Sequence, residues 1–219
     1  MNIGVLGTGV VGETIATALT KKGHNVRMGS RTADNEKAAA WVKKANEHAT
    51  QGDFDDAAGF GDLVFFCLNG EHALDALKLF HADSLQGKIL IDLTNPLDFS
   101  RGMPPRLLEG FDHTSLGEKI QEALPGTFVV KTLNTVNCNV MVDAKLVNKG
   151  NHSLFICGNN QDAKNKVMHF LTDNFNWDAD SFIDLGGIQQ SRVMEAYVPL
   201  WVSIMQAVGT PVFNLKIVR

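Results

Sequence analysis

Three glycines at fixed spacing near the amino terminus, in the segment Gly7-Thr8-Gly9-Val10-Val11-Gly12, are the strongest chemical signal in the sequence. This pattern suits the pyrophosphate of a dinucleotide when the segment follows a strand and opens a helix. Both conditions are predicted here, because Asn2 to Leu6 is a short aliphatic run and apolar residues recur at helical spacing after the loop. We expect the amides around Thr8, Val10 and Val11 to face the pyrophosphate at the positive end of the helix dipole.

The residues after the second predicted strand, His24 to Met28, indicate which dinucleotide binds. An NAD-binding protein usually places a carboxylate there for the ribose 2′-hydroxyl, whereas this chain has Gly29-Ser30-Arg31-Thr32. An arginine can bind a 2′-phosphate through charge-assisted hydrogen bonds, and a serine hydroxyl can add another. The sequence therefore favours NADPH, with Ser30, Arg31 and Thr32 near the extra phosphate.

Two further segments follow predicted parallel strands and should line the nicotinamide half of the same crevice. Leu68-Asn69 stands at the end of the run Asp62 to Leu68, and Asn95-Pro96-Leu97 follows the run Lys88 to Leu93. Asn95 is suited to hydrogen-bond the ribose or the carboxamide, and Pro96 to form a rigid wall beside the ring. An ordinary Asn-Pro turn remains an equal alternative for this pair.

The elements that must position these residues alternate between strand and helix. After the two strands already named, apolar runs predict strands over 62–68, 88–93 and 128–133, with amphipathic helices between them. Alternation of this kind predicts an α/β fold with a doubly wound, mostly parallel sheet, the Rossmann architecture. We expect this dinucleotide-binding domain to cover residues 1–137.

Residues 138–219 predict a small carboxyl-terminal α+β domain that carries the acceptor pocket and a dimer contact. Short strands over 153–157 and 182–185 flank a helix over 161–174. A broad apolar stripe follows, and Pro199 should kink it or begin a second helix. Its aromatic and methionine side chains either stack on the acceptor or form core and subunit interface, with the second favoured and a homodimer as the hypothesis. These side chains are Tyr197, Trp201, Met205 and Phe213.

Composition narrows the class of protein. The formal net charge of −4 comes from scattered residues, so nucleic acid and anionic membranes are unlikely partners. Cys67, Cys138 and Cys157 are few, unpaired by any CxxC motif, and fit reduced core thiols of a cytoplasmic protein. The sequence contains neither a signal peptide pattern nor an apolar run long enough to span a bilayer.

No pattern for a metal site, a nucleophilic serine or a P-loop is present, and the histidines are scattered. A hydride transferred to a carbonyl needs an acid for the developing alkoxide. A flavin-type ring delocalises the charge and can take its proton from solvent, so such a reaction needs mainly the alignment of two rings. The sequence therefore favours a ring acceptor and no dedicated catalytic acid or base.

Several segments together resemble the NADPH:8-hydroxy-5-deazaflavin oxidoreductase family over nearly the whole chain. Besides the glycine loop and Gly29-Ser30-Arg31, they are Asp92 to Leu97, Ser115 to Glu118, Val130 to Thr135, Ile183 to Gly186 and Phe213-Asn214. A related resemblance is to the reductase domain of six-transmembrane metalloreductases. The resemblance implies direct hydride transfer between NADPH and a deazaflavin, or a flavin, with Asn95-Pro96-Leu97 beside the nicotinamide. Asn134 and Thr135 would face the ring pocket or cap a helix.

Two other functions remain open at this stage. One is a reductase of small imines or carbonyl compounds, which usually carries a catalytic lysine; Lys131 lies on a predicted strand and fits that role poorly. The other is a sensor that binds NADPH without catalysis. Oxidation of NADPH by a ring acceptor would separate the proposed enzyme from both.

Overall fold

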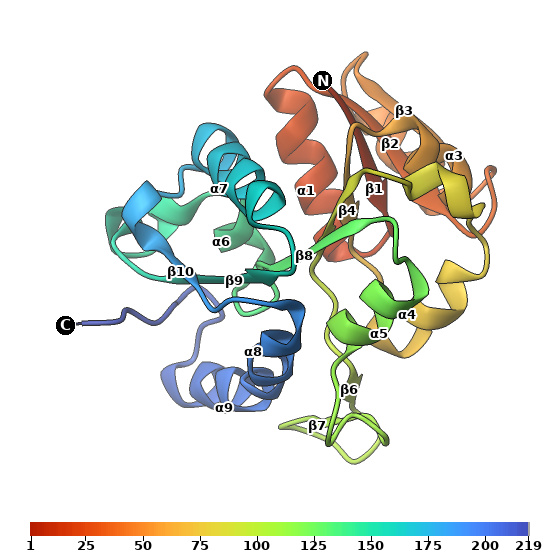
Figure 1. The fold of residues 1–219 in the computed structure, drawn as a ribbon. Coiled ribbons are helices and arrows are strands. Elements are labelled where there is room, and N and C mark those ends of the chain that lie inside the picture. The colour runs from red at the N-terminus through yellow and green to blue at the C-terminus, as the bar shows by residue number, and fades with distance from the viewer. Residues whose placement is uncertain (219) are drawn as a thin grey trace.

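The structure is a computed structural model that describes residues 1–218. Over that range one sheet of eight strands forms the centre of the molecule, in the order β10-β9-β8-β5-β4-β1-β2-β3 (Figure 1). Its strands are β1 (Asn2–Leu6), β2 (Asn25–Ser30), β3 (Ala49–Asp53), β4 (Leu63–Phe66), β5 (Ile89–Asp92), β8 (Phe128–Thr132), β9 (Leu154–Gly158) and β10 (Phe182–Asp184). A separate hairpin pairs β6 (Leu97–Asp98) with β7 (Arg106–Leu107).

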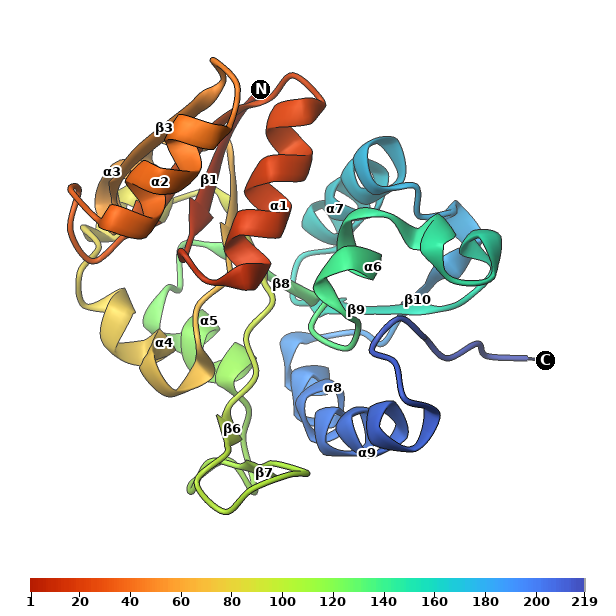
Figure 2. The same cartoon turned by 180° about the vertical axis from the view of Figure 1, so that it is seen from behind.

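Helices cover both faces of the sheet (Figure 2). They are α1 (Val10–Lys21), α2 (Glu36–Lys44), α3 (Phe54–Phe60), α4 (Gly70–Leu77), α5 (Leu116–Ala123), α6 (Cys138–Val142), α7 (Gln161–Phe175), α8 (Ser191–Ala196) and α9 (Val198–Val208). Short 3₁₀ turns lie at Ala82–Leu85, Ala144–Leu146, Asn148–Gly150, Ala179–Ser181 and Ile188–Gln190.

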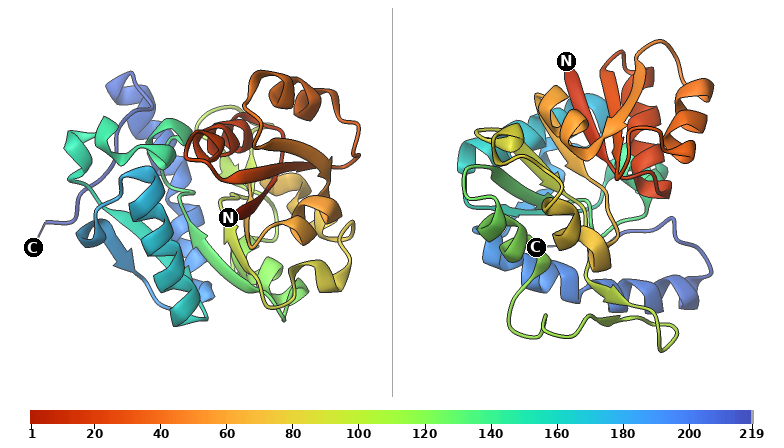
Figure 3. Two further views of the ribbon diagram at one scale, coloured as in Figure 1. Left: turned by 90° about the horizontal axis from the view of Figure 1, so that it is seen from above. Right: turned by 90° about the vertical axis from the view of Figure 1, so that its right-hand side faces the viewer.

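The central strands are apolar on both faces because each face packs against helices. β4 has the sequence LVFF and all of its residues are buried. One core lies between the sheet and α1, α2, α6 and α7, and the other lies between the sheet and α3, α4, α5 and α8. Figure 3 shows the molecule from two further sides, with helices on either side of the amino-terminal strands. The predicted fold class, a doubly wound and mostly parallel sheet, is confirmed.

The carboxyl-terminal strands extend this same sheet. β9 pairs antiparallel with β8, with Val130 opposite Gly158, and β10 pairs parallel with β9. The sheet therefore runs without a break past residue 137, and the division into two domains at that residue stays a prediction. The expected break near Pro199 is present, since α8 ends at Ala196 and α9 begins at Val198 with Pro199 in its first turn.

Three strands and one helix were not predicted: β3, β6, β7 and α6. β3 is an edge strand with the sequence ATQGD, too polar and too short for an apolar periodicity to reveal it. α3 follows it directly, and Asp53 caps this helix through a reciprocal capping box with Asp56.

Two parts of the chain project beyond the carboxyl ends of the parallel strands. These are the β6–β7 hairpin and the α8–α9 helix pair, which lie at the same end of the molecule in Figures 1 and 2. Parallel α/β sheets place their ligand sites at this end, so both projections stand beside the expected crevice.

Candidate functional site: a dinucleotide crevice at the strand ends

The glycine loop turns tightly between β1 and α1. Gly7 has φ +125°, which other residues rarely adopt, and its amide donates to the carbonyl of Gly29 at 2.9 Å. A Cβ on Gly12 would lie 2.0 Å from the carbonyl oxygen of Gly7, so α1 can pack this close only with glycine there. A Cβ on Gly9 would meet nothing within 4 Å. Two glycines thus shape the loop, and the third leaves the surface open above it.

The first turn of α1 is open to a ligand. Gly9 is the N-cap residue and offers no side chain to cap the helix, so the first-turn amides lack that partner. Val10 is 73% exposed, and Val11 is half-buried. Amides at a helix start, with the positive end of the dipole behind them, fit a pyrophosphate as the sequence predicts.

A cavity of about 420 Å³ lies beside this loop. Among the predicted cofactor-binding residues, those that line it are Gly7, Thr8, Gly9, Ser30, Arg31, Leu68 and Asn69. Val10, Val11, Gly12, Thr32, Asn95, Pro96 and Leu97 are outside its lining. The cavity therefore brings part of the predicted phosphate half together with Leu68 and Asn69, which were expected at the nicotinamide half, and the Asn95-Pro96-Leu97 segment lies outside its lining.

The charge of this cavity fits an anionic ligand. Arg31 is exposed, and Lys37 and His72 join it from α2 and α4, while none of the described lining residues is acidic. Lys37 and His72 were not predicted from the sequence. Lys37 follows shortly after Arg31 and just after Asn35, the N-cap residue of α2, which is the signal that could have revealed it. The cationic side chains and the open amides therefore fit a dinucleotide with an extra phosphate.

Ser30 has a different partner from the one expected. Its hydroxyl is buried and donates to the carbonyl of Thr32 at 2.5 Å. In this arrangement Ser30 holds the turn that carries Arg31, and its hydroxyl would have to rotate to reach a phosphate.

The ends of β4 and β5 contact each other closely. The side chain of Asn69 accepts from the amide of Glu71 and caps α4. A Cβ on Gly70 would lie 2.0 Å from the carbonyl oxygen of Asn95, so the start of α4 packs directly on the Asn95-Pro96 backbone. Pro96 is buried, and Leu97 starts the β6–β7 hairpin. This contact connects the cavity to the predicted nicotinamide end.

Asn95 and Asn134 hold each other. Nδ2 of Asn95 donates to the backbone carbonyl of Asn134 at 3.0 Å, and Nδ2 of Asn134 donates to Oδ1 of Asn95 at 2.8 Å. Asn134 also donates to the carbonyl of Met194 on α8, at 3.3 Å. Asn134 follows Leu133, a buried residue at φ 63°, a conformation that costs a bulky residue about 1–3 kcal/mol. Asn134 therefore joins the strand ends rather than capping a helix, and Asn137 caps α6 instead.

A buried ionic cluster contacts the backbone of Thr94, the residue before Asn95. Nζ of Lys131 lies 2.9 Å from Oδ2 of Asp92 and 2.8 Å from Oε1 of Glu195, and all three side chains are almost wholly buried. Burial lowers the pKa of Lys131, but the two carboxylates outweigh it and hold that pKa above its usual range. Lys131 is thus a fixed ammonium on β8, and its poor fit to a catalytic role stays a prediction.

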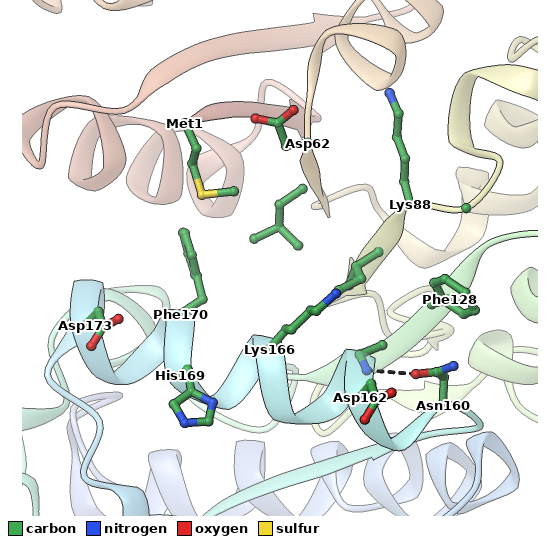
Figure 4. Close-up of a pocket in the computed structure, with 14 residues that line it drawn as sticks. Met1, Asp62, Lys88, Phe128, Asn160, Asp162, Lys166, His169, Phe170 and Asp173 are labelled. Carbon is green, nitrogen blue, oxygen red and sulfur yellow. Dashed lines mark hydrogen bonds between the residues drawn. The ribbon is translucent and has the colours of Figure 1, made fainter.

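A larger cavity, of about 740 Å³, lies at the amino-terminal edge of the sheet, the opposite end from the glycine loop. Lys166 and Phe170 of α7 point toward the strands, across from Met1 and Asp62 (Figure 4). Its charged side chains are of both signs, and it includes none of the predicted cofactor residues. Size alone therefore does not identify the site.

The apolar carboxyl-terminal segment packs partly on itself. Trp201 stacks on Phe213 with ring centroids 5.2 Å apart. Val193, Leu200 and Val208 are each more than half exposed. Tyr197 and Met205 are half-buried. A role of this segment in a homodimer or in acceptor binding stays a prediction.

Comparison with known proteins identifies the family. Residues 2–96 match the family model described as NADP oxidoreductase coenzyme F420-dependent. The F420-dependent NADP reductase of Methanocaldococcus jannaschii is 32% identical, over 99% of this chain and 100% of the relative. This chain belongs to the F420-dependent NADP reductase family. The resemblance predicted from the motifs is confirmed, and the chain is an NADP-dependent oxidoreductase.

A solved structure and a mammalian metalloreductase also resemble this chain. A crystal structure assigned to an F420-dependent NADP-reductase from Arthrobacter sp. FB24 is 41% identical, covers 100% of both chains and superposes with a TM-score of 0.91. The metalloreductase STEAP3 of Rattus norvegicus is 28% identical over 90% of this chain, which spans 36% of that relative. Within residues 1–218 of this chain, no helix is long and apolar enough to cross a membrane.

Proposed function

We propose that the enzyme transfers a hydride directly between NADPH and a deazaflavin, with a flavin as the second ring acceptor to test. The names of its relatives support the deazaflavin. One structural observation carries the proposal: the polar groups that bond to the Asn95 segment are amides and a lysine held between two carboxylates. None of them is placed to give up or take a proton, and a ring acceptor needs no such group.

In this proposal the two halves of the crevice have separate tasks. The loop amides after Gly9 hold the pyrophosphate, and Arg31 with Lys37 holds the 2′-phosphate. The Asn95-Pro96 segment orients the nicotinamide, which supplies the hydride when bound. The acceptor ring gains that hydride together with a proton from solvent. The chain itself therefore contributes binding and orientation rather than acid–base chemistry.

A panel of acceptors tests this function. NADPH and NADH are each mixed with the enzyme and 8-hydroxy-5-deazaflavin, FMN, a cyclic imine or a ketone, and oxidation is followed by absorbance. We expect turnover with NADPH and the deazaflavin, and a kcat/KM for NADH at least about tenfold lower, since one lost charge-assisted contact costs this much. Turnover with the imine or ketone alone would contradict the proposal. NADPH binding without turnover of any acceptor would favour a sensor.

A further inference from the structure

The buried cluster of Asp92, Lys131 and Glu195 has no task in hydride transfer as proposed, yet it joins four elements at the strand ends. Asp92 ends β5, and its Oδ1 accepts from the amide and the hydroxyl of Thr94 at 2.8 and 2.7 Å. Lys131 lies on β8 and also donates to the carbonyl of Thr94 at 2.5 Å. The residue after Thr94 is Asn95, so the cluster holds the base of the segment expected beside the nicotinamide.

Glu195 brings α8 and α5 into the same cluster. Its Oε2 accepts from the amide of Leu116 at 2.9 Å, and its Oε1 accepts from the amide of Gly117 at 3.0 Å. Two carboxylates face one ammonium, and the positive end of the α5 dipole offsets part of the excess negative charge. Each of the four carboxylate oxygens of Asp92 and Glu195 therefore has at least one hydrogen-bond or ion-pair partner.

The neighbour of Glu195 makes a second connection to the same place. Met194 accepts from Nδ2 of Asn134, which in turn holds Asn95. Two consecutive residues of α8 are thus fastened to β8 and the residues after it, one by charge and one by a backbone carbonyl. α8 leads into α9 at Val198, so this fastening also sets the position of the apolar helix pair.

Stability alone does not explain such a cluster. Removing three charges from water is expensive, and apolar residues of similar volume often stabilise a fold as well or better. What a buried ionic cluster can supply is one defined arrangement of the elements that it joins. The elements joined here are those that border the predicted nicotinamide end.

We propose that Asp92, Lys131 and Glu195 are positioning residues, which hold α8 and the acceptor side of the crevice at a fixed distance from the Asn95-Pro96 segment. The proposal rests on the proposed function in two respects, that the nicotinamide lies beside this segment and that the acceptor binds on the side of α8. Hydride transfer depends steeply on the separation of the two reacting carbons, and a misplacement of about 1 Å can lower the rate by about a hundredfold. Loosening the cluster therefore affects the chemical step more than cofactor binding.

The test compares Glu195→Gln with Asp184→Asn. The first variant keeps the shape of the cluster and leaves a neutral Asp92–Lys131 pair. The second removes a charge from the Lys164–Asp184 pair, whose Nζ and Oδ1 are 2.7 Å apart on α7 and β10, and β9 separates β10 from β8. Each full-length variant is assayed for Tm, for NADPH Kd, for kcat with 8-hydroxy-5-deazaflavin, and for amide hydrogen exchange in residues 93–97 and 133–136.

We expect Glu195→Gln to lower kcat about tenfold, with NADPH Kd within about twofold of the wild type, and to speed exchange in both segments about tenfold. Asp184→Asn should lower Tm and leave kcat and these segments unchanged. If Glu195→Gln does not fold, Asp92→Asn, which leaves the Lys131–Glu195 pair, replaces it with the same expectations.

A lowered Tm with wild-type kcat and wild-type exchange would overturn the positioning role. So would equal effects of Glu195→Gln and Asp184→Asn on kcat. If the wild-type enzyme reduces no ring acceptor, the proposed function is wrong, and exchange alone decides the role of the cluster: faster exchange in Glu195→Gln supports it, and unchanged exchange contradicts it.

Discussion

The two ends of the crevice differ in how their polar groups are used. At the phosphate end, the loop above Gly9 is open, the first turn of α1 lacks a side-chain cap, and Arg31 is exposed. At the nicotinamide end, Asn95 and Asn134 bond to each other and Lys131 lies between two carboxylates. The first end is ready to receive charge from a ligand, and the second is already assembled apart from the buried Oδ1 of Asn134, which has no partner among the described residues.

Because of this difference, substitutions at the first end should change cofactor affinity, and substitutions at the second end should change how the cofactor is aligned. Unpaired donors gain most of their hydrogen bonds when an anion arrives, so changes there should alter cofactor affinity. Groups that are paired before binding lose little freedom when the cofactor arrives, so changes there should alter geometry and hence rate.

The largest effect is expected at the glycine loop. Gly12→Ala places a Cβ 2.0 Å from the carbonyl oxygen of Gly7, so the helix must move and NADPH binding should be lost together with about 3 kcal/mol of stability. Gly9→Ala meets no protein atom within 4 Å, so Tm should hold while NADPH binds about tenfold more weakly. Thermal melts and fluorescence titration measure both. Equal behaviour of the two variants would contradict the assigned roles.

The second effect concerns the 2′-phosphate. Arg31→Ala should weaken NADPH by about 10–100-fold and leave NADH nearly unchanged, because only NADPH loses a charge-assisted contact worth about 1.5–3 kcal/mol. Arg27→Ala is the matched control: it removes the same charge from β2, but Arg27 lies over the Phe60 ring, 4.4 Å from its centroid, outside the cavity. Isothermal titration with both cofactors measures the preference. An unchanged preference in Arg31→Ala would refute the assignment.

The smallest effect concerns the pH dependence of the contact between α8 and α5, two helices that are also joined at the nicotinamide end. The hydrogen bonds from Arg192 on α8 hold the pKa of Glu118 on α5 below its usual 4.5, although part of this contact is exposed. Because the folded pKa is lowered, the stabilisation is present above pH 4.5 and disappears as the pH falls through the lowered value. Glu118→Gln should therefore lower Tm by roughly 1–2 °C at pH 7 and by less in acid. A Tm difference that grows in acid would have the wrong sign.

Local patterns in the sequence were enough to predict the phosphate end. The run Asn2 to Leu6, the glycine spacing and the position of Arg31 lie within about 30 residues, and each acts through the backbone next to it. The same holds for the apolar strands, because a strand buried on both faces shows itself by composition. Lys37 carries such a local signal, beside the N-cap Asn35, whereas His72 does not, because the rotation of α4 about its axis, which points His72 at the cavity, is set by packing.

The sequence was enough to locate the nicotinamide end, but not to predict the contacts within it. Asn95 and Asn134 are 39 residues apart, and Glu195 contacts the amide of Leu116 across 79 residues. No spacing rule relates such positions. The pairing of β9 with β8 was missed for the same reason, since an apolar run shows that a strand is buried without showing which strand lies next to it.

The most direct test of the central claim follows the hydride itself. NADPH deuterated at C4, in each stereochemical form separately, is incubated with the enzyme and 8-hydroxy-5-deazaflavin in ordinary water, and the reduced deazaflavin is examined by mass spectrometry and NMR. Direct transfer predicts that one of the two forms delivers its deuterium to the ring carbon of the product with full retention. Loss of the deuterium to solvent from both forms would contradict it.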